Sequence, residues 1–436
     1  MNNKTLAKYY FLPILTYFSF SVVIYFVLYQ FGFVDKLPNS QTLNSGDAGF
    51  YHSIMNNGYF YQADAAGNVG FFPLFAYWWR LTHLGWVGIT VLNGLIYLFS
   101  LGWLCKMLKP DKMVLGLFMA SPYMFFMWSA LSEPIFFLFS VAIVYGILNK
   151  DWRFVFVGTL LASMTRATFL FFIPAYVGMA LMSYPIDKIL NWNTWKKIFS
   201  HYLLPCLLGV SAVVLFQYMQ TGKWFAYFEV QTRVWGRAFD WPAFPFGYRT
   251  VFWNLKSSYV SFWIAMVTAG VGLKLLWDWF RKKEILKSVK DYELFSIIFI
   301  CMSLVSIVFF NAHWMWNPDG EGGGFMSTHF TGINRYTHPT VFFLILLGYY
   351  FNFKKLSLSQ YFGIFFISNL IWFCFDLEYY SHIQRYLKFL IPNLIIISLL
   401  LYHATRWKIL GYGIILGSFI LQGLLYNHYL SLVQLD

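Results

Sequence analysis

The first 29 residues, MNNKTLAKYYFLPILTYFSFSVVIYFVLY (1–29), decide the fold class. After a start that carries Lys4 and Lys8, an apolar run continues to about residue 31. The run is too long for the core of a cleaved signal peptide, and no small-residue cleavage site follows it. We therefore interpret it as a retained membrane-spanning helix.

The rest of the chain repeats this pattern. Of its 436 residues, 59% are hydrophobic and only 11% are charged, against roughly 25% charged residues in a soluble domain. The sequence predicts an all-α polytopic membrane protein, a bundle of about 11–13 transmembrane helices that forms one domain, 1–436. The expected apolar segments lie near 8–31, 84–104, 113–130, 132–149, 153–166, 168–183, 201–220, 257–280, 292–311, 336–353, 358–375, 385–404 and 408–428.

The basic residues indicate an orientation. With the N-terminus in the cytoplasm, the short cytoplasmic loops receive 19 of the 31 lysines and arginines, as the positive-inside rule requires. The three long loops, 32–83, 221–256 and 312–335, then lie on the opposite face. Long loops on a rigid helical frame commonly carry function and hold short juxtamembrane helices, so we look for a site there.

Several classes of function find no support in the sequence. The four cysteines lie in apolar runs without CxxC spacing, which indicates buried apolar side chains (Cys105, Cys206, Cys301 and Cys374). The net charge of +13 fits basic cytoplasmic loops. The sequence has no basic run interleaved with aromatic residues of the kind that a nucleic-acid groove requires. No metal motif, P-loop, dinucleotide fingerprint or nucleophile elbow occurs.

The stretch GDAGFYHSIMNNGY (46–59) follows the first span and is unusually polar. Asp47 and Tyr51 fall on one face of a short predicted helix that Gly58 ends, and His52 lies beside them. Asp47 has two interpretations that the stretch itself leaves open. It caps the helix, or it is a functional acid at the membrane surface.

Two further charges lie inside apolar sequence. Glu133, in ALSEPIFF, is either a solvated turn residue or a functional acid at the mouth of the bundle. Arg166, in ASMTRATFLFF, lies about 20 Å from Arg153 along a helix. It either reaches the interface by extending its side chain or binds an anion at the floor of an outward cavity.

Two loops combine cations with aromatic and amide side chains. TGKWFAYFEVQTRVWGRAFDWP (221–242) holds Gln231, Trp235 and Arg237, and GINRYTHPTVFFL (332–344) holds Arg335 and His338. The first is either an amphipathic helix at the lipid headgroups or a surface that grips a sugar joined to a phosphate.

Five motifs in this order resemble a known family: DAGFYHSIMNNGY with GFFPLF, SPYMFFMWSALSEPIFFLFS, GTLLASMTRATFLFF, TGKWFAYFEVQTRVWGR and NRYTHPTVFFL. The set is similar to bacterial relatives of the transferase that adds the second mannose of GPI (PIG-V-like), in the GT-C class of membrane glycosyltransferases. The tryptophan that often precedes the family's loop acid is Gly46 here. The motif-bearing module covers about 8–353, and the helices of 354–436 carry no motif of the family.

The resemblance implies a GT-C-like bundle and an inverting transfer of a sugar, mannose in most of the family. The donor would be a polyprenyl-phosphate sugar, and the acceptor a hydroxyl of a glycan, lipid or protein on the non-cytoplasmic face. Asp47 would be the general base. The donor phosphate and sugar would meet Arg166, Arg237, Arg335, Gln231, Trp235, Tyr336 and His338, with Glu133, Tyr51 and His52 as further candidates.

The resemblance requires no cofactor, and a divalent metal held by Asp47 and Glu133 stays open as an alternative. We expect the membrane to be a bacterial inner membrane. A transporter or flippase of lipid-linked sugars is the alternative function, and a structural subunit is a third. A transporter would need polar residues on both faces. A structural subunit would not need isolated acids and arginines gathered on one side.

Overall fold

A computed structural model of the chain is helical in every regular element that it describes, as the sequence predicts. The described residues are 3–62, 67–183, 191–234, 237, 239–242, 254–282, 289–310, 332–352, 355–373 and 383–432.

The α-helices keep their order along the chain. They are α1 Asn3–Gln30, α2 Asp47–Asn57, α3 Pro73–Thr82, α4 Trp86–Leu108, α5 Lys112–Met119, α6 Glu133–Asn149, α7 Trp152–Thr165, α8 Phe169–Met182, α9 Trp192–Ile198, α10 Leu204–Thr221, α11 Ala226–Arg233, α12 Asn254–Lys282, α13 Asp291–Phe310, α14 Ile333–Thr337, α15 Val341–Asn352, α16 Leu358–Phe373, α17 Ile383–Thr405 and α18 Lys408–Ser431. A π-helical stretch, Phe199–Leu203, joins α9 to α10.

Six stretches in the described part of the chain are long and apolar enough to cross a membrane. They are Tyr10–Gln30, Trp86–Leu108, Trp192–Thr221, Val260–Arg281, Asp291–Phe310 and Lys408–Ser431. Shorter apolar helices, α6, α7, α8, α15 and the Asn393–Thr405 part of α17, lie between them. A multi-pass membrane protein is therefore confirmed at the level of helix length and composition.

One expected span is wrong. The segment 113–130 forms α5, which ends at Met119, and a separate 3-10 turn, Met124–Trp128. Pro122 lies in the break, where its ring and its missing N–H prevent a continuous helix. In contrast, the expected short pair 153–166 and 168–183 is found as α7 and α8, joined at Arg166.

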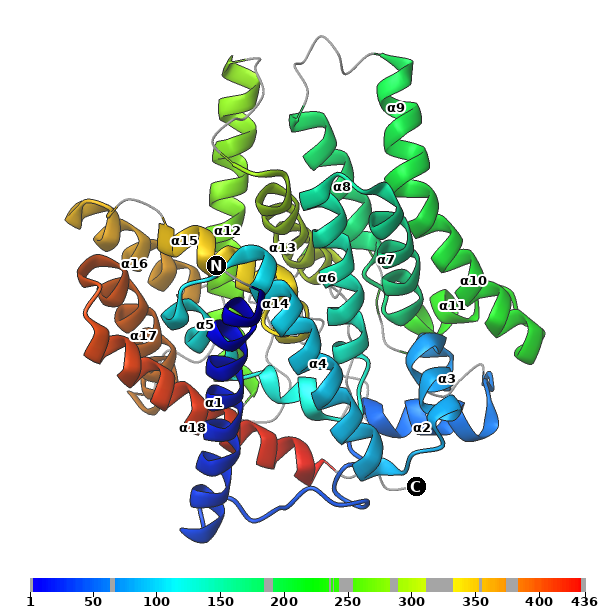
Figure 1. The fold of residues 1–436 in the computed structure, drawn as a ribbon, viewed down its shortest axis with the longest axis horizontal. Coiled ribbons are helices and arrows are strands. Elements are labelled where there is room, and N and C mark those ends of the chain that lie inside the picture. Colours follow the sequence, from blue (N-terminus) through cyan, green and yellow to red (C-terminus); the bar gives the residue numbers. More distant parts are fainter. Residues whose placement is uncertain are drawn as a thin grey trace.

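The helices that carry the long loops meet at one end of the bundle. Figure 1 shows α2 lying across this end beside α3, whereas α9 and the far end of α12 project from the opposite end. Aromatic rings fill the interior between the two ends. The ring centroids of Phe299 and Phe342 are 4.2 Å apart, and Phe172 lies 5.5 Å from Phe299.

Labelling of exposed lysine positions tests the orientation. We expect cysteines at Lys36 and Lys223 to react from the non-cytoplasmic side, and cysteines at Lys109 and Lys408 from the cytoplasmic side. All four side chains are exposed, so the substitutions leave the core intact. Membrane-impermeant maleimide on sealed vesicles measures the side. Reaction of Lys36→Cys and Lys109→Cys from the same side would contradict the charge-based topology.

Candidate functional site

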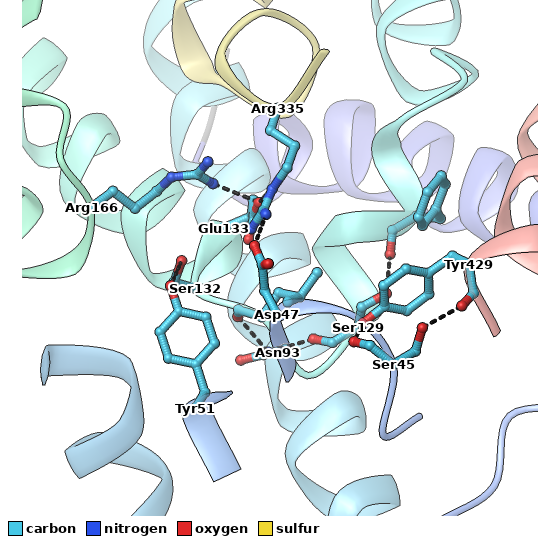
Figure 2. A network of polar contacts seen from close by, with 12 residues as sticks. Ser45, Asp47, Tyr51, Asn93, Ser129, Ser132, Glu133, Arg166, Arg335 and Tyr429 are labelled. Atoms are coloured by element: carbon cyan, nitrogen blue, oxygen red, sulfur yellow. Dashed lines mark hydrogen bonds and ion pairs between the residues drawn. The ribbon is translucent and has the colours of Figure 1, made fainter. Parts of the chain in front are cut away.

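Four charged side chains meet where α2, α6 and α14 come together with the link between α7 and α8. Arg335 pairs with Asp47 through Nη1, and its Nε lies 2.5 Å from Oε1 of Glu133. Nη1 of Arg166 lies 2.6 Å from the same Glu133 oxygen. Figure 2 shows the resulting chain of charges from Asp47 through Arg335 and Glu133 to Arg166. We call these four residues the ion cluster.

The members of the ion cluster differ in exposure. The side chain of Glu133 is 0% exposed and that of Arg166 is 8% exposed, whereas Arg335 reaches 22% and Asp47 33%. The two acids and the two arginines carry equal and opposite formal charge. Burial requires this balance, because an unpaired buried charge is strongly unfavourable. Asp47 is therefore the acid that a ligand can reach, and Glu133 is the buried anchor.

The geometry rules out the helix-cap interpretation of Asp47. The residue begins α2, but no side chain caps this helix, and the Asp47 carboxylate pairs with Arg335 instead. Helices elsewhere do use side-chain caps, since Asp111 and Asp151 each accept a backbone N–H at the starts of α5 and α7. The Asp47 carboxylate therefore pairs with Arg335 and does not cap α2.

Glu133 and Arg166 also depart from their simpler interpretations. Glu133 is the first residue of α6 and is buried, so it is not a solvated turn residue. Arg166 ends α7 in extended backbone and turns inward to Glu133, so it does not extend to the interface. One Glu133 oxygen, Oε2, is buried without a hydrogen-bond partner among the described residues.

Aromatic rings surround the two arginines. The Arg166 guanidinium lies 5.2 Å from the ring centre of Tyr336, and that of Arg335 lies 5.2 Å from the ring centre of Phe126. Burial alone would disfavour the charged form of Arg335, but Glu133 and Asp47 outweigh it. They raise the pKa of Arg335 well above its ordinary value. The ion cluster therefore keeps its cation at any physiological pH.

Polar contacts below the ion cluster fix the turn that carries Glu133. The Tyr51 hydroxyl donates to Oγ of Ser132 over 3.0 Å. The Asn93 amide donates to the carbonyl oxygens of Ser129 and Leu131, over 2.7 and 3.0 Å. Tyr51 is buried, which raises the pKa of its hydroxyl and keeps it protonated. It therefore acts here as a hydrogen-bond donor.

The two histidines lie apart from the ion cluster. His52 stacks on Trp86, with ring centroids 4.5 Å apart. His338 is buried between two serines, with Nδ1 2.5 Å from Oγ of Ser121 and Nε2 2.7 Å from Oγ of Ser261. Arg335 and His338 belong to the same motif, NRYTHP, but Arg335 lies in the ion cluster and His338 lies between the two serines.

The described residues of the loop after α10 lie outside the ion cluster. Gln231 lies on α11, and its amide donates to the carbonyl oxygen of Gly70 over 3.4 Å. Arg237 is exposed, and its backbone N–H donates to the carbonyl oxygen of Gln231. No contact joins Arg237 to the ion cluster among the described residues. Trp235 lies outside the described part of the chain.

The C-terminal helix holds the loop that leads to Asp47, which no motif indicated. Oδ1 of Asn427 accepts the backbone N–H groups of Asp35 and Lys36, and its Nδ2 donates to Asp35. Further along, Oγ of Ser45 donates to the carbonyl oxygens of Tyr429 and Leu432. The end of α18 therefore fixes both ends of the segment 35–45, immediately before α2.

Loss of the Asn427 contacts should loosen this segment. Asn427→Leu removes three hydrogen bonds, each worth ~0.5–1.5 kcal/mol, so we expect at least about tenfold faster amide exchange at Asp35 and Lys36. The double variant Asn427→Asp with Asp35→Asn exchanges donor and acceptor and should restore protection. Hydrogen exchange with mass spectrometry measures both. Unchanged exchange in Asn427→Leu would show that α18 does not hold the segment.

A metal would find few ligands here. Among the described residues, no group of three or more histidine, cysteine, aspartate or glutamate side chains is arranged to bind an ion. The two acids of the ion cluster already share Arg335. A metal between Asp47 and Glu133 would have to replace that guanidinium.

The comparisons with known proteins give no neighbour for this arrangement. No protein-family profile, no curated protein and no solved structure matches the chain significantly. The ion cluster therefore has to be interpreted from its own chemistry and from the sequence motifs that supply it.

Proposed function

We propose that the protein is a membrane glycosyltransferase that moves a sugar, mannose by the motif resemblance, from a polyprenyl-phosphate carrier to an acceptor hydroxyl. The observation that carries the proposal is the ion cluster. It combines one reachable acid, Asp47, with two arginines that a buried acid holds in place. Four of the five resembling motifs supply its members: Asp47, Glu133, Arg166 and Arg335 come from four separate segments.

The chemistry of such a transfer needs both signs of charge. Asp47 accepts the proton of the acceptor hydroxyl while that oxygen forms a bond to the anomeric carbon of the sugar. The bond from this carbon to the phosphate oxygen breaks, and its electron pair leaves with the polyprenyl phosphate. Arg335 and Arg166 stabilise the negative charge that collects on the leaving phosphate. Attack and departure on opposite faces invert the anomeric configuration.

The ion pair between Asp47 and Arg335 couples donor binding to the release of the base. In the structure the Asp47 carboxylate is held by Arg335 and is not available as a base. A donor phosphate competes with Asp47 for the same guanidinium. Donor binding thus releases Asp47 beside the sugar, and the base becomes active only when a donor is present.

The exposure of the four residues fits this order of events. Glu133 is buried and keeps its pairs with both arginines, so it positions them without reacting. Arg335 and Asp47 are partly exposed, which lets phosphate and acceptor approach them. The charge distribution of the loops favours the non-cytoplasmic side for this face, and the motif resemblance favours a bacterial inner membrane.

Donor consumption tests the proposal. The purified full-length chain in nanodiscs receives radiolabelled polyprenyl-phosphate mannose and a lipid and glycan extract from the same cells. Transfer predicts release of polyprenyl phosphate in step with a labelled product. Movement of intact donor between leaflets of sealed vesicles, without consumption, would instead identify a flippase and overturn the proposal.

A further inference from the structure

A large cavity lies between α12, α15, α17 and α18. Its volume is ≈ 950 Å³, near the upper end of ligand cavities, which span about 300–1,000 Å³. Aliphatic side chains make up much of its wall, among them Val267, Val271, Leu275, Leu347, Leu399 and Leu421. Such a wall suits a hydrocarbon chain.

The cavity follows α12 for much of its length. Its lining runs from Val260 to Asp278, which at ~1.5 Å per residue is about 27 Å. The hydrocarbon core of a bilayer is ~30 Å thick. The cavity is therefore long enough for an extended acyl chain that enters from either leaflet.

Aromatic rings separate the cavity from the ion cluster. His338 lines the cavity and stacks on Tyr123, with ring centroids 5.7 Å apart. Tyr123 stacks in turn on Phe126, at 6.0 Å, and Phe126 carries the Arg335 guanidinium on its face. None of the four residues of the ion cluster lines the cavity, so we treat its ligand as separate from a phosphate bound at the ion cluster.

Charged groups gather at the other end of the cavity. Lys274 and Asp278 lie one turn apart on α12, and Lys290 and Glu293 lie at the start of α13. Lys274 and Asp278 form no ion pair with each other or with another described residue. Glu293 Oε2 accepts the backbone N–H of Lys290 over 3.0 Å, and Nζ of Lys290 donates to the Tyr292 hydroxyl over 3.2 Å. Two cations and two carboxylates thus line the same apolar cavity.

We propose that this cavity binds a zwitterionic glycerophospholipid with an ethanolamine headgroup. An acyl chain lies along α12, the phosphate faces Lys274 and Lys290, and the ammonium group faces Asp278 and Glu293. A primary ammonium donates hydrogen bonds to carboxylates, whereas an anionic glycerol headgroup offers no cation to pair with them. The proposal does not depend on the transferase activity.

Native mass spectrometry tests this site. The delipidated full-length chain is mixed with equal amounts of phosphatidylethanolamine and phosphatidylglycerol that carry the same acyl chains. The ion pairs between the headgroup and the protein would lie at the partly exposed end of the cavity, so each contributes little. We therefore expect the ethanolamine lipid to be favoured roughly threefold to tenfold. Asp278→Asn removes one of the two carboxylates with little change in shape and should lower this preference measurably.

A matched pair of tryptophan variants separates the cavity from the outer surface of the bundle. Val267→Trp fills the cavity and should reduce binding of both lipids. Leu273→Trp on the same helix is the control, since Leu273 is 67% exposed and does not line the cavity. Its binding should match that of the unaltered chain.

Three results would overturn the assignment. Equal binding of the two lipids by the unaltered chain would reject the headgroup. Equal binding by Val267→Trp and Leu273→Trp would place the lipids on the outer surface. Displacement of the ethanolamine lipid by polyprenyl phosphate would assign the cavity to the donor.

Discussion

Replacement of the buried acid, Glu133→Gln, should destabilise the protein more than any other single change in the ion cluster. Glu133 is 0% exposed and balances two guanidinium groups. Its removal leaves an uncompensated buried positive charge between Arg166 and Arg335, which costs about 3–5 kcal/mol. The thermal midpoint of the detergent-purified protein, followed by fluorescence-detected size exclusion, measures the loss.

Two further variants make this test specific. Glu229→Gln is the surface control, because its partners Lys223 and Arg233 are 45% and 61% exposed, and such pairs contribute at most about 1 kcal/mol. The double variant Glu133→Gln with Arg166→Gln restores the charge balance and should recover part of the loss. If Glu133→Gln were no worse than Glu229→Gln, Glu133 would not anchor the ion cluster.

Asp47→Asn should abolish most of the transfer and leave the fold intact. The amide keeps an oxygen for Arg335, and Asp47 is one-third exposed, so the lost charge disturbs the structure little. The amide does not accept the acceptor's proton, and we expect turnover to fall by roughly 10²–10⁴. The donor should still bind, because its phosphate partners, Arg335 and Arg166, are unchanged.

The control for this variant makes the same chemical change elsewhere. Asp111→Asn alters a helix cap at the start of α5, and asparagine caps about as well as aspartate. Turnover of Asp111→Asn should equal that of the unaltered protein. Near-normal turnover by Asp47→Asn would remove Asp47 from the chemistry and leave it a partner of Arg335 alone.

Much of the architecture could be predicted from the sequence because it depends on local patterns. Long apolar runs specify helices, and α2 begins at Asp47 and ends before Gly58 as its residues indicate. Gly58 has φ +77°, a backbone conformation that residues with a β-carbon rarely adopt, so this position favours glycine. The break at Pro122 was the exception, since a single proline in an apolar run does not show whether the run ends or bends.

The pairing within the ion cluster could not be predicted. Asp47 and Arg335 are 288 residues apart, and Glu133 and Arg335 are 202 apart. Each charge is unusual in its own segment, which marks it as a candidate. Only packing of the helices shows which acid is buried and which is reachable.

The α18 contacts were missed for a different reason. Asn427 acts through hydrogen bonds to the backbone of Asp35 and Lys36, and backbone groups leave no signal in the partner sequence. His338 shows the opposite problem. It lies three residues after Arg335 in a motif, yet its side chain reaches Ser121 and Ser261 rather than the ion cluster.

A structure of Asp47→Asn with bound polyprenyl-phosphate mannose, determined by electron cryomicroscopy, tests the central claim most directly. We expect the donor phosphate within hydrogen-bond distance, about 3 Å, of Arg335 or Arg166. The residue at position 47 should be released from Arg335 toward the sugar. A phosphate bound away from both arginines, or a donor held in the cavity along α12 with the ion cluster unchanged, would contradict it.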